Sequence, residues 1–525
     1  MTTPETAEPP RAVAPIGGAV LRVERRPLPA VDPFALLAAL PAARSHLFWR
    51  APGEDAWVAV GRALRVGSGS LRPSGRDGIL GLGPAIGEAV DAALGGGLGA
   101  GDEVPGGLRV LFSVAFDPSA AFGRGADAEA PDAWPEVWAR GVPGEAPWRG
   151  YAPIEAFVPE VLVRLPGEGA AGGETEPGAA VRGEAILVGD PERLAELRAE
   201  LAGWFEAAAR RPAFDEPRDG DLAIEWAGGE HRANVAAALG ALRRPGLSKV
   251  VLAHAVEVRA GRPFSPASLL AELGRLHPGC VLVSLRPAPG AAVFLGASPE
   301  RLARVEDDGD GVRRVSSGAL AGSAPRGATP EEDEAFGRRL LASVKDLDEH
   351  AIVGDMIAEA LSPLCLRLER GGAPVLERLR NVQHLFTPVS GVLRPRRGIF
   401  DAVAALHPTP AVGGMPRERA LAAIRELERE PRGLYAGVVG WADLAGRGDS
   451  AVAIRSALVD GDRARVYAGG GIVATSDPDV EVEETRLKMA AVLEALEARA
   501  DREGPPSAGR GGAARTGGHE RRSGA

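Results

Sequence analysis

The sequence predicts an α+β fold, because segments of strand length occur in runs and segments with helical spacing lie between those runs. Strict alternation of strand and helix, which would predict a parallel sheet, is absent from the sequence. Repeats of the solenoid type are absent as well. A chain of 525 residues corresponds to roughly three or four domains of ~150 residues, although large single α/β units also reach this size.

The first part of the predicted fold spans residues 18–222 and follows a polar, Pro-rich arm at 1–17 that we expect to be disordered. Asp32 offers an N-cap and Pro33 a first-turn proline for a short helix that ends at Leu40. Apolar runs and turn signals predict the other elements: strands at 19–23, 46–50, 57–66, 108–116, 157–165 and 185–188, a surface loop at 167–183, and a helix at 191–210.

The second part spans residues 223–498 and ends before a tail at 499–525, whose Gly, Arg, Ser and Pro content predicts disorder. Val482, Met489 and Val492 recur at helical spacing and predict a helix that continues to about residue 496. The same patterns predict helices at 230–242, 266–276 and 331–364, and strands at 249–258, 280–285, 292–295, 434–443, 451–458 and 465–473.

Charge and cysteine usage limit the class of protein. A net charge of −10 argues against nucleic acid or an anionic membrane as the main partner, while a small anionic ligand could still bind in a local basic pocket. Cys280 and Cys365 stand in apolar surroundings without CxxC spacing, which is typical of buried thiols. No apolar run approaches the ~20 residues of a membrane span, and the start of the chain lacks the pattern of a signal peptide. We therefore expect a soluble cytoplasmic protein.

Two pairs of acidic residues have helical spacing. Glu481 and Glu484 stand at i and i+3 just after a glycine run, and Asp346 and Glu349 repeat this spacing in the predicted helix 331–364. Two such helices can surround one hard cation, and Mg²⁺ fits best because it accepts few carboxylates and keeps water ligands. Spacing alone favours the simpler interpretation of two solvated helix faces, with the acids near a helix N-terminus.

Three other charged residues are candidates for chemistry. Lys249 opens an apolar strand, so it either extends to solvent at the strand edge or lies in a pocket where it could act as a general base. Glu300 follows a Pro turn, where it either pairs with Arg301 or lines a cavity and donates a proton. Arg455 lies inside an apolar strand, and its planar guanidinium suits a substrate carboxylate unless that strand is half exposed.

Two histidines and two glycine sites could each have either a structural or a functional role. His384 and His407 could be hydrogen-bonded core histidines. Gly322 and the run 469–471 could serve turns, or could let backbone amides approach an anion closely. The glycine run lacks the register of a dinucleotide fingerprint, and no nucleotide P-loop motif occurs in the sequence.

Nine segments in order resemble the chorismate-binding enzymes, the family of isochorismate synthase, salicylate synthase, anthranilate synthase component I and aminodeoxychorismate synthase. The segments extend over residues 225–497 and include Lys345-Asp-Leu-Asp-Glu-His350, Leu406-His-Pro-Thr-Pro-Ala411 and Gly469-Gly-Gly-Ile-Val473. The others are 248–253, 295–300, 320–323, 437–441, 454–456 and 481–488. The resemblance implies one large unit, in which two sheets pack across each other with helices outside and the site between them.

The resemblance also implies roles for the candidate residues. Lys249 would activate water for attack at C2 of chorismate, and Glu300 would protonate the departing C4 hydroxyl. Mg²⁺ would bind Glu349 and Glu484, with Asp346 and Glu481 nearby or bound through water. The remaining implied contacts are with the substrate: Arg455, Gly471 and Tyr467 around the enolpyruvyl carboxylate, and Gly322, His384, Ala411 and Lys488 along the site. No redox cofactor is implied.

Within this family the resemblance is to isochorismate synthase, an isomerase that serves menaquinone or catecholate siderophore synthesis. With a lysine at 249, the chain resembles the members that add water. Ala411 argues against salicylate synthase, which goes on to eliminate pyruvate. A member that binds chorismate without converting it is a further alternative. His254 stands where members commonly have arginine, and the first 220 residues match only loosely. Many members of this branch are monomers, so we expect a monomer.

Overall fold

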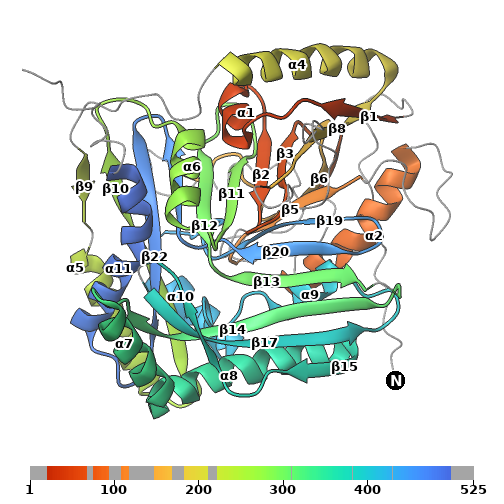
Figure 1. The fold of residues 1–525 in the computed structure, drawn as a ribbon. Helices are drawn as coiled ribbons and strands as arrows, with labels where there is room; N and C mark the ends of the chain where they lie inside the picture. Colours follow the sequence, from red (N-terminus) through yellow and green to blue (C-terminus); the bar gives the residue numbers. More distant parts are fainter. Residues whose placement is uncertain are drawn as a thin grey trace, which may run out of the picture.

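The computed structural model describes residues 21–67, 75–93, 108–117, 147–167, 183–210, 222–226, 228–308, 310–380, 382–428 and 430–497. These residues form two large antiparallel sheets with helices on their outer faces (Figure 1). Strands β11 and β12 of the first sheet run steeply across β13, β14 and β17 of the second in this view. The predicted α+β class and the two crossed sheets are confirmed.

The first sheet has twelve strands, in the order β1-β8-β7-β3-β2-β11-β12-β21-β22-β10-β18, and β9 pairs with β10. Its strands come from both predicted parts of the chain, so the two parts share one sheet. The bounds are β1 (Arg22–Leu28), β2 (His46–Arg50), β3 (Ala56–Val60), β7 (Val161–Leu165), β8 (Gly183–Gly189), β9 (Ala223–Glu225), β10 (Lys249–Arg259), β11 (Val281–Arg286), β12 (Val293–Ser298), β18 (Gly414–Met415), β21 (Ser456–Asp460) and β22 (Arg463–Ile472).

The second sheet has ten strands, in the order β15-β17-β14-β13-β20-β19-β5-β6-β4, and β16 pairs with β17. It too combines strands of both predicted parts, which makes the fold one unit. The bounds are β4 (Leu64–Gly67), β5 (Val110–Val114), β6 (Ile154–Val158), β13 (Arg301–Asp307), β14 (Arg313–Pro325), β15 (Cys365–Arg370), β16 (Val375–Arg378), β17 (Val382–Leu393), β19 (Val438–Ala442) and β20 (Gly448–Val452).

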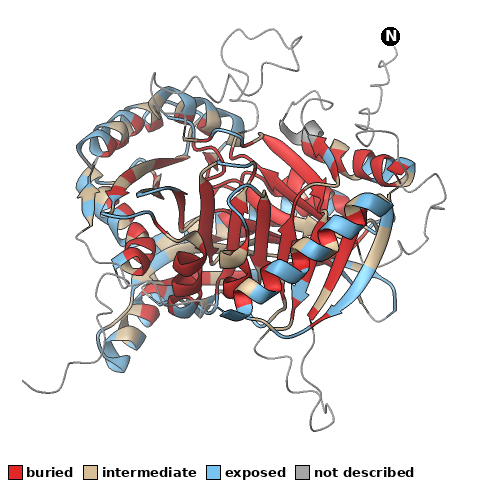
Figure 2. Cartoon of the chain, turned by 90° about the horizontal axis from the view of Figure 1, so that it is seen from above, coloured by how far each residue is buried: buried red, intermediate tan, exposed pale blue. Residues whose placement is uncertain are grey.

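The helices cover the sheets, with their buried sides toward the sheets and their exposed sides toward solvent (Figure 2). Helices α1 (Pro33–Ala39), α4 (Pro191–Arg210), α5 (Gly228–Leu242), α6 (Pro266–Leu276), α10 (Arg417–Leu427) and α11 (Pro478–Glu497) pack on the first sheet or on one another. Helices α2 (Gly75–Ala93), α7 (Pro330–Ala342), α8 (Val344–Leu361) and α9 (Ile399–Leu406), and the 3-10 turn η4 (Ser362–Leu364), lie against the second. No helix in the described part is long and apolar enough to cross a membrane.

Two neighbouring chain segments bend from one sheet into the other. The first leaves β12 and enters β13 through Pro299 and Glu300, and the second leaves β20 and enters β21 through residues 453–455. The two bends are bonded together, because Val452 N donates to the Glu300 carbonyl at 3.0 Å and Ala297 N donates to the Arg455 carbonyl at 3.1 Å. Both candidate side chains therefore lie at the line where the sheets meet.

Several predicted elements are wrong in extent, and the cause in each strand is a bend between sheets. The predicted strand 451–458 is divided at Arg455, whose φ of 51° takes the chain out of β20. The predicted strand 157–165 is β6 followed by β7, and the predicted strand 57–66 is β3 followed by β4, with the turn at Gly61. The sequence of an apolar run does not show where such a bend occurs, because residues before and after the bend are buried and apolar.

The predicted helix 331–364 is also divided. It consists of α7, α8 and η4, and Ser343 is the N-cap of α8, where its Oγ accepts from Asp346 N at 3.3 Å. The strands β13–β17 are missing from the prediction. The predicted arm at 1–17, the tail at 499–525 and the inner part of the loop at 167–183 lie outside the described residues.

Candidate active site

A cavity of about 310 Å³ lies where β10, β14, β17 and β22 meet the first turns of α8 and α11. All thirteen residues predicted from the sequence line it, although they come from segments more than two hundred residues apart. They are Lys249, Glu300, Gly322, Asp346, Glu349, His384, Ala411, Arg455, Tyr467, Gly471, Glu481, Glu484 and Lys488.

Lys249 begins β10 and reaches across β22 to helix α8. Its Nζ donates to Glu349 Oε1 at 2.5 Å, and its side chain is 13% exposed. Gly471 lies beneath it, because a Cβ at that position would come within 2.8 Å of Lys249 Cε. The lysine therefore lies in the cavity rather than at an exposed strand edge, and the glycine makes room for it.

Glu300 lies at the bend between β12 and β13. Burial raises the pKa of its carboxyl to about 7, although the charges of Lys249 and Lys488 oppose this rise. Arg301, its alternative partner, instead lies 3.0 Å from Asp449. A carboxyl with this pKa is partly protonated near neutral pH and can donate a proton into the cavity.

Arg455 occupies the left-handed region, with φ of 51°, and lines the cavity. Gly296 permits this backbone, because a Cβ there would lie 2.9 Å from the Arg455 carbonyl oxygen. Within the described residues no hydrogen bond or ion pair engages its guanidinium. Burial lowers the pKa of this guanidinium, but arginine is so strong a base that the group stays charged. The stacked rings of Tyr435 and Tyr467, with centroids 5.3 Å apart, form the adjoining wall. This half-buried cation is available for an anionic ligand.

Two acids of the cavity are paired with lysines. Glu349 pairs with Lys249, and Glu484 Oε1 lies 2.5 Å from Lys488 Nζ, which also donates to the Gly469 carbonyl at 3.0 Å. Burial acts to raise the pKa of Glu484, but Lys488 outweighs it and the net shift is downward. Two of the four carboxylates predicted to hold or surround a cation thus have a lysine beside them already.

Glu481 differs from these two acids. It is buried, and its Oε2 has no hydrogen-bond partner within the described residues. Burial raises its pKa. No three His, Cys, Asp or Glu side chains of the described residues lie close enough together to hold a metal ion. Mg²⁺ needs only one or two carboxylates besides water and ligand oxygens. The carboxylates of Glu349 and Glu484, with the unpartnered Oε2 of Glu481, are therefore chemically suited to Mg²⁺.

His384 lines the same cavity as Arg455. Burial, with the charges of Arg455 and Lys488, lowers its pKa to about 3, so the ring is neutral. Its Nδ1 lies 3.2 Å from the Gly322 carbonyl oxygen and 2.9 Å from Ser323 Oγ. A carbonyl only accepts, so the bond to Gly322 places the proton on Nδ1 and leaves Nε2 as an acceptor. His407, in contrast, is a core histidine whose Nε2 donates to backbone carbonyls.

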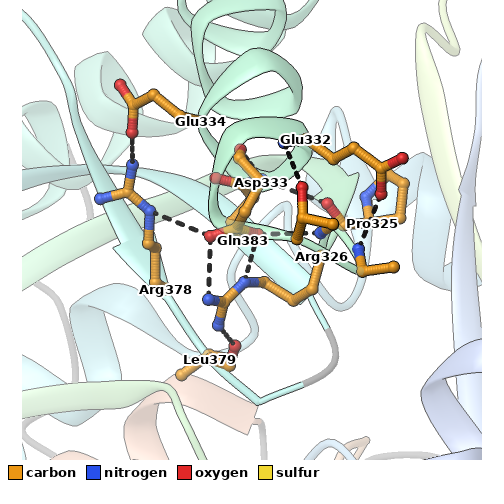
Figure 3. Close-up of polar contacts among 11 residues, drawn as sticks. Pro325, Arg326, Glu332, Asp333, Glu334, Arg378, Leu379 and Gln383 are labelled. Atoms are coloured by element: carbon orange, nitrogen blue, oxygen red, sulfur yellow. Dashed lines mark hydrogen bonds and ion pairs between the residues drawn. The ribbon is translucent and has the colours of Figure 1, made fainter.

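A polar network beside the cavity joins α7 to the ends of β14 and β17 (Figure 3). Arg326 donates to both carboxylate oxygens of Asp333, at 2.6 and 2.9 Å. Gln383 Nε2 donates to the carbonyl oxygens of Pro325 and Asp333, at 3.1 and 3.2 Å. Gln383 is fully buried and directly precedes His384, so this network fixes one edge of the cavity wall.

Comparison with known proteins agrees with this arrangement. Residues 189–497, more than half of the chain, match the family described as chorismate binding enzyme. The chain belongs to the chorismate-binding enzymes. The resemblance found in the nine sequence segments is confirmed.

Individual relatives of this chorismate-binding enzyme are isochorismate synthases. Isochorismate synthase MenF of Bacillus subtilis is 48% identical over 203 residues, which cover 39% of this chain and 42% of the relative. The salicylate biosynthesis isochorismate synthase of Pseudomonas aeruginosa is 43% identical over 266 residues, 51% of this chain and 54% of the relative. The matches thus span about half the length of these two relatives.

The fold has a solved counterpart in MenF, the menaquinone-specific isochorismate synthase of Escherichia coli. That structure covers 94% of this chain and 96% of its own, with a TM-score of 0.66 and 23% identity. At this identity the likeness concerns the fold, which therefore extends through the first 220 residues that match the family only loosely in sequence.

One buried pair in this chorismate-binding enzyme was not predicted from the sequence. Arg432 donates through Nε and Nη2 to Glu428 at 2.8 and 2.6 Å, through Nη2 to the Val251 carbonyl at 2.6 Å, and through Nη1 to the Val412 carbonyl at 2.8 Å. Glu428 in turn accepts from Ala253 N at 2.8 Å. A short polar loop sequence has no signal for this role, since the partners are backbone groups of distant segments.

Arg432 and Glu428 bind backbone groups on one edge of β10, in a gap where no described strand pairs with it. On that edge β18 pairs with β10 at Lys249 and Val250, and β9 pairs with residues 257–259. Between these two short strands, Arg432 and Glu428 satisfy the Val251 carbonyl and the Ala253 amide, which would otherwise be buried without partners. The same arginine holds the turn that contains Ala411 through Val412. Arg432 therefore links β10, two residues after Lys249, to the residue that follows Ala411.

Proposed function

We propose that this protein is an isochorismate synthase, which converts chorismate to isochorismate. The observation that supports it best is that Lys249 and the partly protonated Glu300 face one cavity together with an unpaired arginine, Arg455. Base, acid and anion-binding cation are the three groups that this reaction requires. The names of the relatives point to the same activity.

The reaction replaces one hydroxyl by another, so its energy changes little and positioning supplies most of the catalysis. Lys249 takes a proton from a water molecule as the water oxygen attacks C2 of the ring. The double bond shifts, and the C4 hydroxyl leaves as water after Glu300 gives it a proton. One water enters and one water departs, so substrate and product are isomers.

Arg455 would bind the enolpyruvyl carboxylate, because its guanidinium can make two parallel hydrogen bonds to it. The backbone near Gly471 and the ring of Tyr467 would complete this subsite, since both line the cavity beside β22. Gly322, His384, Ala411 and Lys488 would bound the remainder of the ring. A neutral His384 with Nε2 as acceptor can receive a hydrogen bond from a substrate hydroxyl.

Mg²⁺ would be held by Glu349 and Glu484, with Asp346 and Glu481 nearby or bound through water. When bound, it would neutralise the ring carboxylate of the substrate. For these carboxylates to serve the metal, Lys249 and Lys488 have to release them, since both pairs are closed at 2.5 Å.

Glu484→Gln is expected to raise the Mg²⁺ concentration needed for half-maximal activity by at least tenfold, because an amide is a far weaker ligand than a carboxylate. A metal titration of activity, and of thermal stability without substrate, measures this shift. Glu483→Gln is the matched control, since Glu483 is exposed on the same helix and does not line the cavity. An unchanged titration for Glu484→Gln would contradict the proposed metal site.

Arg432→Met is expected to lower kcat by on the order of 100-fold, because a displacement of about 1 Å at a reacting group has an effect of that size. Arg62→Met is the control: Arg62 also donates twice to a buried glutamate, Glu155, at 2.9 and 3.1 Å, but lies away from the cavity. Both variants should lose stability, measured by thermal melting, while only the first should lose kcat in the folded state. Equal kcat for both would show that the Arg432 pair does not position Lys249.

Product analysis after incubation with chorismate and Mg²⁺ tests the proposed activity. We expect isochorismate. Salicylate with pyruvate would support a salicylate synthase instead, and binding of chorismate without any product would support a non-catalytic member of the family. Isochorismate could serve menaquinone or catecholate siderophore synthesis, and the genes beside this one would distinguish the two routes.

A further inference from the structure

Lysine is rare in this chain, and its distribution is uneven. Among 61 basic residues only three are lysines, Lys249, Lys345 and Lys488, and the others are arginines. All three lysines line the one cavity described above, which is formed by 28 of the 525 residues. Chance would seldom bring every lysine of a protein to so small a part of it, so the cavity selects for this side chain.

The chemistry of the two basic side chains explains the selection. Arginine forms rigid, bidentate pairs with carboxylates, whereas the lysine ammonium is a compact point charge on a flexible stem. The cavity contains four acids that are proposed to serve a cation, and a bidentate arginine would hold such an acid permanently. Lysines can pair with these acids and release them, and Lys249 and Lys488 each contact one carboxylate oxygen only.

Lys345 has no part in the proposed catalysis or metal binding. It is the second residue of α8, where the positive end of the helix dipole disfavours a cation. No hydrogen bond or ion pair engages its ammonium within the described residues, in contrast to Lys249 and Lys488. The side chain is exposed and also lines the cavity, so it lies at the mouth. Its position therefore has no explanation in stability.

We propose that Lys345 captures the anionic substrate at the mouth of the cavity, where its ammonium contacts a carboxylate of the entering molecule. The identity of that substrate, a dianion, rests on the proposed function. A protein with a net charge of −10 repels a dianion at long range, so a free cation at the entrance is needed to guide the ligand past the acids behind it. The charge of Lys345 also acts on Glu481, one of those acids.

The test compares graded charge changes at two positions. Lys345→Met and Lys345→Glu should lower kcat/KM by about tenfold and about a hundredfold, within the range of electrostatic steering, and should leave kcat within about twofold of wild type. The dependence of kcat/KM on ionic strength should become flatter in the same order. Arg338→Met and Arg338→Glu are the controls, since Arg338 is exposed on α7 and lies outside the cavity. They should change neither quantity by more than about twofold.

A binding measurement keeps the proposal separate from the proposed activity. Calorimetric titration with chorismate in the absence of Mg²⁺ should show weaker binding for the Lys345 variants than for the Arg338 variants. If wild type binds chorismate but forms no isochorismate, the proposed function fails while this comparison still decides the role of Lys345. Equal effects at the two positions, or a wild-type protein that does not bind chorismate, would overturn the proposal.

Discussion

Lys249→Met is expected to lower kcat by about 10²–10⁴, the usual contribution of a general base. Methionine retains the length and the apolar stem of the lysine and removes only the amine, so the packing over Gly471 should persist. The loss should appear at saturating chorismate and Mg²⁺, because the variant removes the group that takes the proton from water. Steady-state rates at both saturating concentrations measure it.

The fold and the metal response of Lys249→Met serve as its controls. Thermal melting should resemble that of wild type, since an ion pair that is partly open to solvent contributes little to stability. Affinity for Mg²⁺ should be retained or increased, because Glu349 no longer has an ammonium beside it. Wild-type turnover in the variant would mean that another group accepts the proton.

Glu300→Gln is expected to lower kcat to a similar degree, by about 10²–10⁴, because an amide of the same shape cannot donate the proton that the leaving hydroxyl needs. Glu272→Gln is a suitable control, since Glu272 is also buried, pairs with Arg275 and lies away from the cavity. Chorismate binding should survive in both variants. Full activity of Glu300→Gln would exclude this carboxyl as the acid.

The pH dependence of activity gives a second test of Glu300 as the proton donor. The pKa of Glu300 is raised from its ordinary value of 4.5 to about 7, so the proton is present below pH 7 and is lost as the pH rises through that value. In wild type kcat/KM should therefore fall on the alkaline side of about pH 7, and Glu300→Gln should lack this fall. The linked effect on stability has the same sign. Relative to Glu300→Gln, wild type should lose stability as the pH rises from about 4.5 to about 7, because in this range the unfolded carboxyl has released its proton while the buried one retains it; above about pH 7 no further loss is expected.

Much of the site could be predicted because its chemistry is local in sequence. The acids at 346, 349, 481 and 484 have a helical spacing that places each pair on one face, and the structure brings both pairs to one cavity. Lys249 and Arg455 were recognisable as charges in apolar segments, where an unpaired charge has a high desolvation cost. Lys345 could have been found as well, from the scarcity of lysine in the sequence.

The missed strands have a physical explanation. β14 and β17 contain Gly318, Gly322, Pro388 and Gly391, which are turn signals in a sequence and weaken a strand by themselves. In the fold these two long strands pair with each other, and β14 also pairs with β13, so the ladder outweighs the local preference. The sequence of a single segment does not show which distant strands it will pair with.

The sequence alone determined the α+β class, the order of most elements, the family and the residues that line the cavity, because strand and helix periods and short motifs are properties of neighbouring residues. Only the tertiary structure decided where the chain bends between sheets, and those bends bring Glu300 and Arg455 into the cavity. It also decided the pairing of Lys249 with Glu349 and the raised pKa of Glu300. Both depend on burial and on partners distant in sequence, which local patterns do not specify.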